Sequence, residues 1–275
     1  MENKHSPGFV RNYLLVPAHI CDLVIKEGAF RDFQIYMFLK ARFRGNAKLT
    51  PTDFQCLADE LSISKKTFDR SISKLRRRNW VGYDAKNGIY YFRGFEKIKQ
   101  LERLTGRKSA LLTTHTDIHS FQRFKAFVVG ASFGNDVKNQ KWQEVCKIRS
   151  EQSEGTSYHH LIKQLPSHFP LACTYLAKKF GIAISTASVY KKLAARYGFL
   201  DVIRNQRLID SLMLTGEEGA TEQGRGIPAR LANQFKHAYP DHAKRVRIKK
   251  GYLYLDEPDT AKSLMEFRRR RIKRA

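Results

Sequence analysis

The residues of this chain that could do chemistry are its histidines and one dense group of carboxylates. His115 and His119 stand four residues apart, which on a helix would let both imidazoles bind one metal ion, but no third ligand stands nearby. The adjacent His159 and His160 lack the His-apolar-His order of nicking replication enzymes. Carboxylates concentrate at 256–259, but a metal-dependent nuclease needs them to converge, and their spacing matches no such pattern. We therefore expect no catalytic residue, no metal site and no cofactor.

Phosphate-loop and disulfide chemistry are excluded by spacing. Residues 106–109, Gly-Arg-Lys-Ser, end like a phosphate-binding loop, but Arg107 intrudes between glycine and lysine and no upstream glycine is in place. The four cysteines lie far apart without paired spacing: Cys21, Cys56, Cys146 and Cys173. We interpret them as reduced thiols of a cytosolic protein rather than as a disulfide framework or a zinc site.

Positive charge is the strongest feature of the composition. The 275 residues include 51 Lys and Arg against 26 Asp and Glu, which gives a formal net charge of +25. Such an excess repels itself in a compact chain unless a polyanion neutralises it. Nucleic acid is the favoured polyanion and a membrane surface is the rival. The chain has no apolar run of the roughly 18 residues that span a bilayer. Its N-terminus lacks the pattern of a secretory signal. We expect a cytoplasmic protein, nucleoid-associated if bacterial or phage, with no membrane partner.

The elements that would position these charges are clearest between residues 54 and 92. Apolar residues at helical spacing predict one helix through Phe54, Leu57, Ala58 and Leu61 and a second through Phe68, Ile72 and Leu75. Between the two, Ser62 and Ile63 form a break and Ser64 is a good N-cap. Thr50 and Pro51 predict the start of the first helix, and a further helix is expected over residues 31–43.

A hairpin is predicted directly after the second helix. Two short apolar stretches, residues 81–84 and 89–92, flank Ala85-Lys86-Asn87-Gly88. Asn-Gly is the strongest short hairpin signal, because both residues tolerate the positive φ that such turns require.

Helix, turn, helix and hairpin together resemble a winged helix-turn-helix DNA-binding domain over about residues 30–95. The resemblance is carried by Leu57-Ala58, Leu61-Ser62-Ile63-Ser64, Thr67-Phe68, Ile72, Leu75 and the hairpin. In that family the second helix enters the major groove and the hairpin touches the phosphate backbone. Asn79 stands where the family usually has glycine, and asparagine also tolerates the left-handed conformation. The alternative is a small helical domain that only packs.

The resemblance implies a set of DNA contacts in the first half of the chain. On the second helix these are Lys65, Lys66, Thr67, Arg70, Ser73 and Arg77, and at the hairpin tip Lys86 and Asn87. Lys and Arg near the helix start can reach guanine or phosphate. Arg76, Arg77 and Arg78 would either contact phosphates or complement the negative end of the helix dipole.

The second half of the chain repeats this pattern 119 residues later. Leu176, Ala177 and Phe180 match Leu57, Ala58 and Leu61, and residues 181–183 fall on the turn. The next helix is expected over residues 185–197. Lys191 stands where Ile72 is expected to be buried, so the buried face would shift to Ala187, Tyr190 and Ala194.

The repeat implies a second set of candidate contacts. They are Ser185, Thr186, Ser188, Lys191 and Lys192 on the helix, with Lys249 and Lys250 at the tip of a hairpin. This helix is less charged than the first, so it either reads DNA through hydroxyls or binds a protein partner. Its wing is residues 199–203 with a return at 207–209, or the hairpin of 245–248 and 252–255, which would otherwise be an addition. The tail from Arg268 to Arg274 contains the run Arg268, Arg269, Arg270 and Arg271. It would enter a minor groove, bind phosphates, act as a nuclear import signal or remain solvated.

These observations predict a mainly α fold with small β-hairpins (α+β), containing two winged helix-turn-helix domains in tandem. We place the first domain with an N-terminal arm at residues 1–104, a connecting region at 105–156 with a hinge over 135–156, and the second domain at 157–275. Residues 215–226, polar and glycine-rich, are expected to be mobile.

The expected function is non-enzymatic, sequence-specific binding of double-stranded DNA, used in transcription regulation. Two alternatives stay open. Plasmid or phage replication initiators are similar tandem winged-helix proteins, and a nucleic-acid-coating or scaffolding protein would use the same folds to bind protein. RNA also remains a candidate ligand for basic winged helices.

Overall fold

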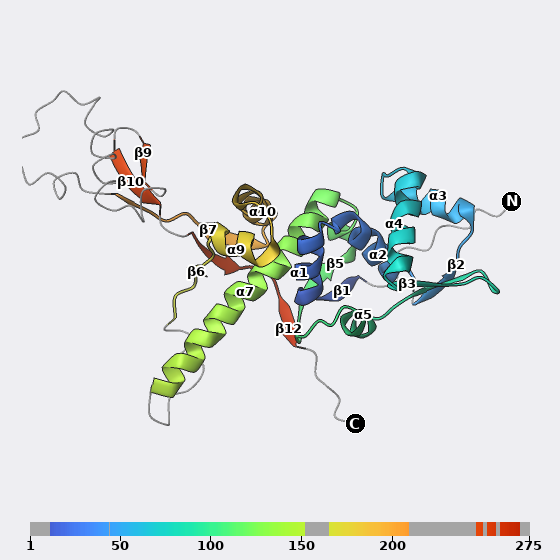
Figure 1. Cartoon of the computed structure of the whole chain (residues 1–275), viewed down its shortest axis with the longest axis horizontal. Coiled ribbons are helices and arrows are strands. Elements are labelled where there is room, and N and C mark those ends of the chain that lie inside the picture. Colours follow the sequence, from blue (N-terminus) through green and yellow to red (C-terminus); the bar gives the residue numbers. More distant parts are fainter. Residues whose placement is uncertain are drawn as a thin grey trace, which may run out of the picture.

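The computed structural model describes residues 12–43, 45–151, 165–208, 246–249, 252–256 and 259–269. Within them the chain forms a mixed α+β structure of helices and small antiparallel sheets (Figure 1), which confirms the predicted α+β class. Residues 215–226 and the pair His159-His160 lie outside these ranges. No helix in the described ranges combines the length and apolar character needed to cross a membrane.

The predicted helices and hairpin of the first half are confirmed, and we call them the first repeat. Its elements are β2 (Asn46–Lys48), α3 (Pro51–Glu60), α4 (Lys65–Arg77), β3 (Val81–Asp84) and β4 (Ile89–Phe92). The strands form a sheet in the order β2-β4-β3. Both predicted caps are present, because the Thr50 side chain accepts from the N–H of Asp53 and that of Ser64 from the N–H of Thr67.

The second repeat has the same order of elements. They are β6 (Phe169–Pro170), α9 (Cys173–Phe180), α10 (Ile184–Arg196), β7 (Leu200–Ile203) and β11 (Thr260–Ser263). The helix predicted over 185–197 is thus confirmed, one residue earlier than expected. Its sheet has the order β6-β11-β7, equivalent to β2-β4-β3 in the first repeat.

The two repeats share unusual backbone positions as well as elements. Ser62 and Gly181, 119 residues apart, both have positive φ, at 53° and 67°, and so do Asn79 at 57° and Gly198 at 75°. The N–H of Ile63 donates to the carbonyl of Ala58 (3.0 Å), and the equivalent pair Ile182 and Ala177 does the same (3.1 Å). The left-handed residue expected at Asn79 is therefore present, and two left-handed residues fix the chain path at both ends of α4 and of α10.

Eight further elements form the body that carries both repeats. They are β1 (Tyr13–Pro17), α1 (Ala18–Glu27), α2 (Phe30–Arg42), α5 (Phe95–Leu101), β5 (Lys108–Thr113), α6 (Thr114–Asp117), α7 (Phe121–Glu151) and β12 (Phe267–Arg269). Helix α2 is the helix expected over 31–43, and its side chains are buried nearly all around. Strands from both ends of the described chain pair with β5 in the order β1-β5-β12. Residues 13–17, expected as part of an arm, are thus an edge of a sheet.

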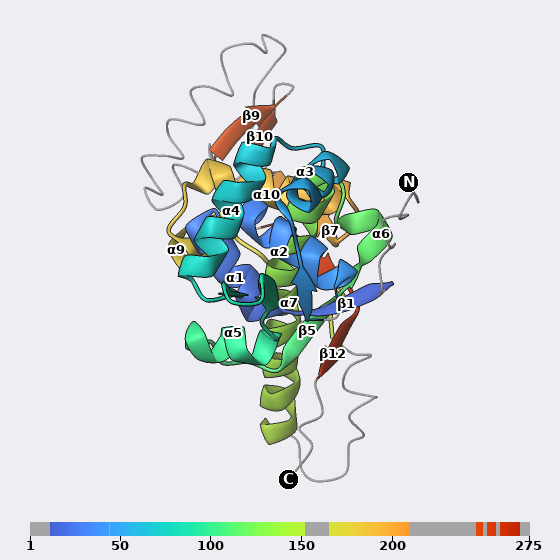
Figure 2. The same ribbon diagram turned by 90° about the vertical axis from the view of Figure 1, so that its right-hand side faces the viewer.

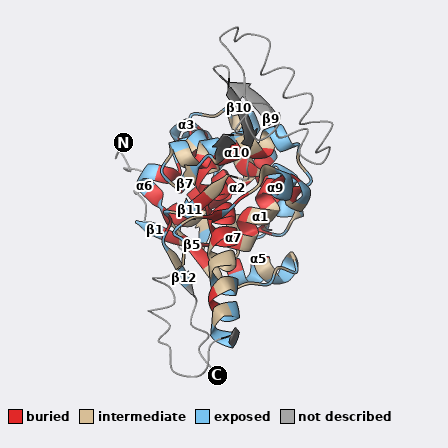
Figure 3. Cartoon of the chain, turned by 90° about the vertical axis from the view of Figure 1, so that its left-hand side faces the viewer, coloured by how far each residue is buried: buried red, intermediate tan, exposed pale blue. Residues whose placement is uncertain are grey.

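Helix α7 occupies the place where a hinge was predicted over residues 135–156. It continues through Glu151, and every residue from 126 to 137 is buried. Figure 3 shows the buried residues concentrated where α1, α2 and α7 meet, whereas the far end of α7 is more exposed. The predicted hinge is wrong over the described residues 135–151. It was inferred from polar residues, but Ser132, Asn135 and Asp136 are buried in this helix rather than facing solvent. Residues 126–137 of the predicted connecting region therefore belong to the core, and residues 152–156 of the predicted hinge lie outside the described residues.

Two of the buried polar residues of α7, Ser132 and Asp136, have partners on neighbouring helices, whereas the side-chain oxygen of Asn135 has no hydrogen-bond partner among the described residues. Lys179 of α9 donates two hydrogen bonds to Asp136 (2.7 and 2.8 Å), and Ser132 donates to Asp22 of α1. Burial alone would lower the pKa of Lys179, but the charges of Asp22 and Asp136 outweigh it and hold that pKa above its ordinary value. This cluster joins the body to the second repeat.

Two glycines let the second repeat approach α7 closely. A Cβ added at Gly130 would lie 2.5 Å from the Cβ of Phe199, and one added at Gly134 would lie 2.5 Å from the Oγ of Ser263. Real Cβ atoms do not come so close, so any side chain at these positions would push α7 away from β11 and from the turn before β7.

The wing of the second repeat differs from both predicted versions. Strand β7 pairs with β11, Ile203 standing opposite Thr260. The return strand was expected at residues 207–209. The observed strand β8 (Gln206–Leu208) pairs instead with β10 (Tyr252–Asp256). The predicted hairpin of β9 (Val246–Lys249) and β10 is present, but it belongs to a separate sheet in the order β8-β10-β9. This sheet stands away from the body (Figures 1 and 2), so a long insertion separates the two strands of the wing.

We predict that Gly130→Ala destabilises the protein by about 1–2 kcal/mol, because the new methyl group would overpack the contact with Phe199. The sign of the change in unfolding free energy is decisive, because alanine in an unobstructed helix is favoured over glycine by up to about 1 kcal/mol and would stabilise the protein. Urea unfolding followed by circular dichroism measures the difference. Lys147→Ala is the control, because Lys147 is an exposed residue of the same helix, and the stability of this variant should stay within about 0.5 kcal/mol of the parent. A more stable Gly130→Ala variant would contradict the packing argument.

Candidate nucleic-acid interface

Helix α4 is amphipathic, and its exposed face carries most of the predicted contacts of the first repeat. Phe68, Ile72 and Leu75 are buried on one side. The exposed side chains among the predicted contacts are Lys66, Thr67, Arg70, Ser73 and Arg77, while Lys65 is partly buried. The Ser73 hydroxyl donates to the carbonyl of Asp69 (2.9 Å), one turn back in the helix. Lys66, Arg70 and Arg77 therefore present long cationic donors to solvent from a single helix face.

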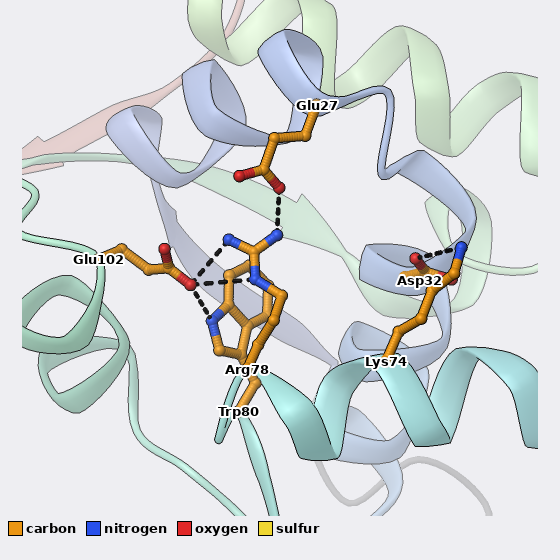
Figure 4. Close-up of polar contacts among 6 residues, drawn as sticks. All are labelled: Glu27, Asp32, Lys74, Arg78, Trp80 and Glu102. Carbon is orange, nitrogen blue, oxygen red and sulfur yellow. Dashed lines mark hydrogen bonds and ion pairs between the residues drawn. The ribbon is translucent and has the colours of Figure 1, made fainter.

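The opposite side of α4 is held to the body by ion pairs, shown in Figure 4. Asp32 of α2 accepts a hydrogen bond from Ser71 (2.6 Å) and lies 3.3 Å from the ammonium group of Lys74. At the end of the helix, Arg78 donates to Glu27 and to Glu102. These contacts give α4 a fixed orientation on α1 and α2.

The side chain of Arg78 has carboxylate and aromatic partners within the chain. Glu102 also accepts from the indole N–H of Trp80 (2.7 Å), and the guanidinium of Arg78 lies 4.6 Å from the centre of the Trp80 ring. Burial alone would lower the pKa of Arg78, but the hydrogen bonds and charges of Glu102 and Glu27 raise it above its ordinary value. Arg77, by contrast, is exposed.

The hairpin β3–β4 presents both predicted tip residues to solvent. Lys86 and Asn87 are exposed, and the Asp84 carboxylate accepts from the Lys86 N–H (2.9 Å) and the Asn87 amide (2.7 Å). The Asn87 amide, followed by the Lys86 N–H, lowers the pKa of Asp84. Of the two residues expected to adopt positive φ, Gly88 does so at 67° and Asn87 does not. The turn therefore needs one left-handed residue, because Asp84 holds the rest of it by hydrogen bonds.

The sequence did not predict that a cationic side chain packs on two aromatic rings of the hairpin. The guanidinium of Arg76 lies 4.9 Å from the centre of the exposed Tyr83 ring, and Tyr83 packs on Tyr90 with ring centres 4.6 Å apart. Tyr83 and Tyr90 are directly opposite in the hairpin register. Strand alternation alone would have placed these two tyrosines together, and only the tertiary fold brings Arg76 to them.

On α10 one predicted contact is wrong. Lys191 is 3% exposed, and its ammonium group donates to the Asp259 carboxylate and to the carbonyl of Leu171 (3.1 Å). Because it occupies the position of Ile72, its side chain points into the fold, where Asp259 compensates its charge. Ala187, Tyr190 and Ala194 are buried as expected. Ser185 and Lys192 are exposed, and Thr186 and Ser188 are partly buried.

The exposed face of α10 also contains two aliphatic residues that were not predicted as contacts. Ile184 is 54% exposed and Val189 is 58% exposed. They stand 119 residues after Lys65 and Arg70, so the repeat alignment itself would have identified them.

The remaining predicted contacts lie at or beyond the limits of the described structure. Lys249 is the last residue of β9, opposite Tyr252, and Lys250 lies outside the described residues. The predicted tail begins as a strand, because Arg268 and Arg269 pair with Ser109 and Lys108 of β5. The Arg268 side chain donates to Glu266 (2.7 Å), so its charge is partly matched within the chain. Arg270 and Arg271 lie outside the described residues.

The structure describes only part of the histidine and carboxylate groups, because His159, His160 and Glu257 lie outside its ranges. Helix α6 ends at Asp117, so His115 and His119 do not share a helix, contrary to the geometry that a metal pair would need. Among the described residues, no group of three or more His, Cys, Asp or Glu side chains could hold a metal ion. Lys108 and Ser109 lie in β5 rather than at the start of a helix, where a phosphate loop would end.

Comparison with protein-family models, with curated proteins and with solved structures finds no match to this chain.

We predict that Lys191→Met destabilises the protein by about 3 kcal/mol, because Asp259 and the Leu171 carbonyl would lose their cationic donor inside the fold. Thermal and urea unfolding at neutral pH measure the loss. The exposed neighbour Lys192 supplies the control, and Lys192→Met should change stability by less than about 0.5 kcal/mol. Equal effects of the two substitutions would show that the Lys191–Asp259 pair contributes nothing.

Proposed function

We propose that this protein binds double-stranded DNA in a sequence-specific manner, through a winged helix-turn-helix in each repeat, and regulates transcription. The observation that carries the proposal is the exposed face of α4, where Lys66, Arg70 and Arg77 project from a helix whose other face is buried. A helix in the major groove reads bases with side chains near its N-terminus. Lys66, Thr67 and Arg70 stand in the first two turns of α4.

The chemistry of these side chains suits base recognition. Arginine and lysine pair with the O6 and N7 acceptors of guanine, and threonine or serine hydroxyls contact either acceptors or donors. The hairpin tip, with Lys86 and Asn87, supplies donors for phosphate beside the helix, and Arg77 adds another at the helix end. The net charge of +25 favours association with a polyanion.

The contacts that hold α4 on the body favour sequence-specific binding over non-specific binding. Asp32 fixes the middle of the helix and the Arg78 contacts fix its end, so the reading face needs little reordering on binding (Figure 4). Both repeats also pack on the same body through α1, α2 and α7, and the buried apolar residues described in both belong to one cluster. Two helices fixed on a common core would read two half-sites at a set spacing, on the order of one helical turn of about 10 bp.

Replication initiation is the second candidate use of the same binding. Two reading helices fixed in one chain suit directly repeated half-sites, because the chain itself has no need of a two-fold dimer axis. A DNA fragment with the gene and its flanks, joined to a selectable marker without an origin, tests this use. Autonomous maintenance that is lost with Arg70→Ala would favour the initiator, and failure to replicate would favour the regulator.

Selection of bound duplexes from a random-sequence pool tests the proposal, and we predict a two-part motif. Arg70→Ala should weaken binding to the selected site by about 1–3 kcal/mol and relax the base preference in one half, because a donor to base edges is lost. Lys66→Ala should act in the same half-site. Lys147→Ala removes an exposed charge from the far part of α7 and serves as the matched control, with affinity close to that of the parent.

Measuring affinity over a series of salt concentrations distinguishes sequence-specific binding from non-specific coating of the DNA. Strong binding without base preference, with an affinity that falls steeply as salt rises, would contradict sequence-specific reading and favour a coating or scaffolding protein. Absence of duplex binding even at low salt would overturn the proposal and direct the search to RNA or protein partners.

A further inference from the structure

We propose that the two repeats read different bases: α4 reads guanine through its cationic donors, and α10 reads A·T base pairs through thymine methyl groups. This inference rests on the proposed function and adds the base preference of the second half-site. Ile184 and Val189 are the residues that would make the methyl contacts.

The first step is that α10 presents its residues with the same backbone as α4. The two helices have the same length and begin 119 residues apart, at Lys65 and Ile184. Equivalent hydrogen bonds close both ends, including Trp80 N–H to Leu75 (2.9 Å) and Phe199 N–H to Ala194 (2.9 Å). Each position on α4 can therefore be matched with one on α10, and Arg70 and Val189 are exposed at equivalent positions, whereas Lys65 is partly buried and Ile184 is exposed.

The second step is the change of side-chain chemistry at those positions. Where α4 has Lys65 and Arg70, α10 has Ile184 and Val189, which are 54% and 58% exposed. Aliphatic side chains neither donate nor accept hydrogen bonds, so they cannot recognise guanine. The C5-methyl of thymine is the apolar group that the major groove offers, and it accepts apolar contacts. Ser185 lies between the two aliphatic residues and can bond to either kind of base edge.

The third step is the charge around this apolar centre, which favours DNA over an apolar protein partner. Residues 171–200 contain no Asp or Glu, while Lys178, Lys192 and Arg196 are exposed there. The two helices of the second repeat thus carry cations and no carboxylates beside these aliphatic residues, which complements a groove floor that carries methyl groups between two rows of phosphates. In the first repeat, by contrast, α3 and α4 carry Asp53, Asp59, Glu60 and Asp69.

The test uses the full-length chain and the duplex selected from the random pool. Selection with Arg70→Ala first identifies the half-site read by α4, because its base preference relaxes. Thymines in the other half-site are then replaced one at a time by deoxyuridine, which removes the methyl group and keeps the base pair. We expect the affinity to fall about fourfold for each contacted methyl. The same replacement in the α4 half-site should leave affinity unchanged.

A variant then assigns the contact to the helix. Val189→Ala should weaken binding to the thymine site several-fold and remove most of the effect of deoxyuridine at one position. Leu101→Ala, which shortens an exposed aliphatic residue on α5, is the matched control and should keep the full effect. Val189 is exposed and alanine favours helix, so the variant is expected to fold, and its circular dichroism spectrum checks this.

The outcomes separate the inference from the proposed function. A specific two-part site whose second half lacks thymine, or tolerates deoxyuridine and Val189→Ala without loss, would overturn the inference while the proposed function stands. The apolar face of α10 would then be assigned to a protein contact. Failure to select any site would overturn both.

Discussion

The burial of residues 126–137 of α7 on all sides is the constraint on which the rest of the structure depends. From residue 126 to 137 the helix meets α1 and α2 on one side and the second repeat on the other. Gly130 and Gly134 allow this because a side chain at either position would collide with Phe199 or Ser263. The orientation of one repeat relative to the other is thus set by close packing, which adjusts little to strain. In the proposed function, this packing would hold α4 and α10 at a fixed spacing on the DNA.

Within the repeats, a shared backbone carries two different surfaces. The left-handed residues at Ser62 and Gly181, and again at Asn79 and Gly198, fix the turns before and after each second helix. Because the backbone is fixed in this way, the exposed residues of the two helices can differ without changing the fold. The exposed face of α4 carries cations such as Lys66 and Arg70, whereas that of α10 carries the aliphatic Ile184 and Val189. Core positions diverge only with compensation, as at Lys191, whose charge required Asp259.

The second wing shows how a fold accommodates a long insertion. Strand β11 keeps the position that β4 has in the first repeat, although more than 50 residues separate Ile203 from Thr260. The cost of closing a longer loop grows only slowly with its length, so the pairing of β7 and β11 survives. The inserted strands form their own sheet, β8-β10-β9, beyond the wing.

The sequence by itself determined the local elements of this protein, because helical spacing, caps and turns are properties of neighbouring residues. It predicted α2, α3, α4, α9, α10 and the hairpin β3–β4 within a few residues, the caps at Thr50 and Ser64, and the exposed cations of α4. Only the tertiary structure decided what depends on distant partners. It made α7 a core helix where polar residues suggested a hinge, because Lys179 and Asp22 bind those groups. It paired β7 with β11 across the insertion. It also buried Lys191, since Asp259, far along the chain, and the carbonyl of Leu171 accept hydrogen bonds from its ammonium group.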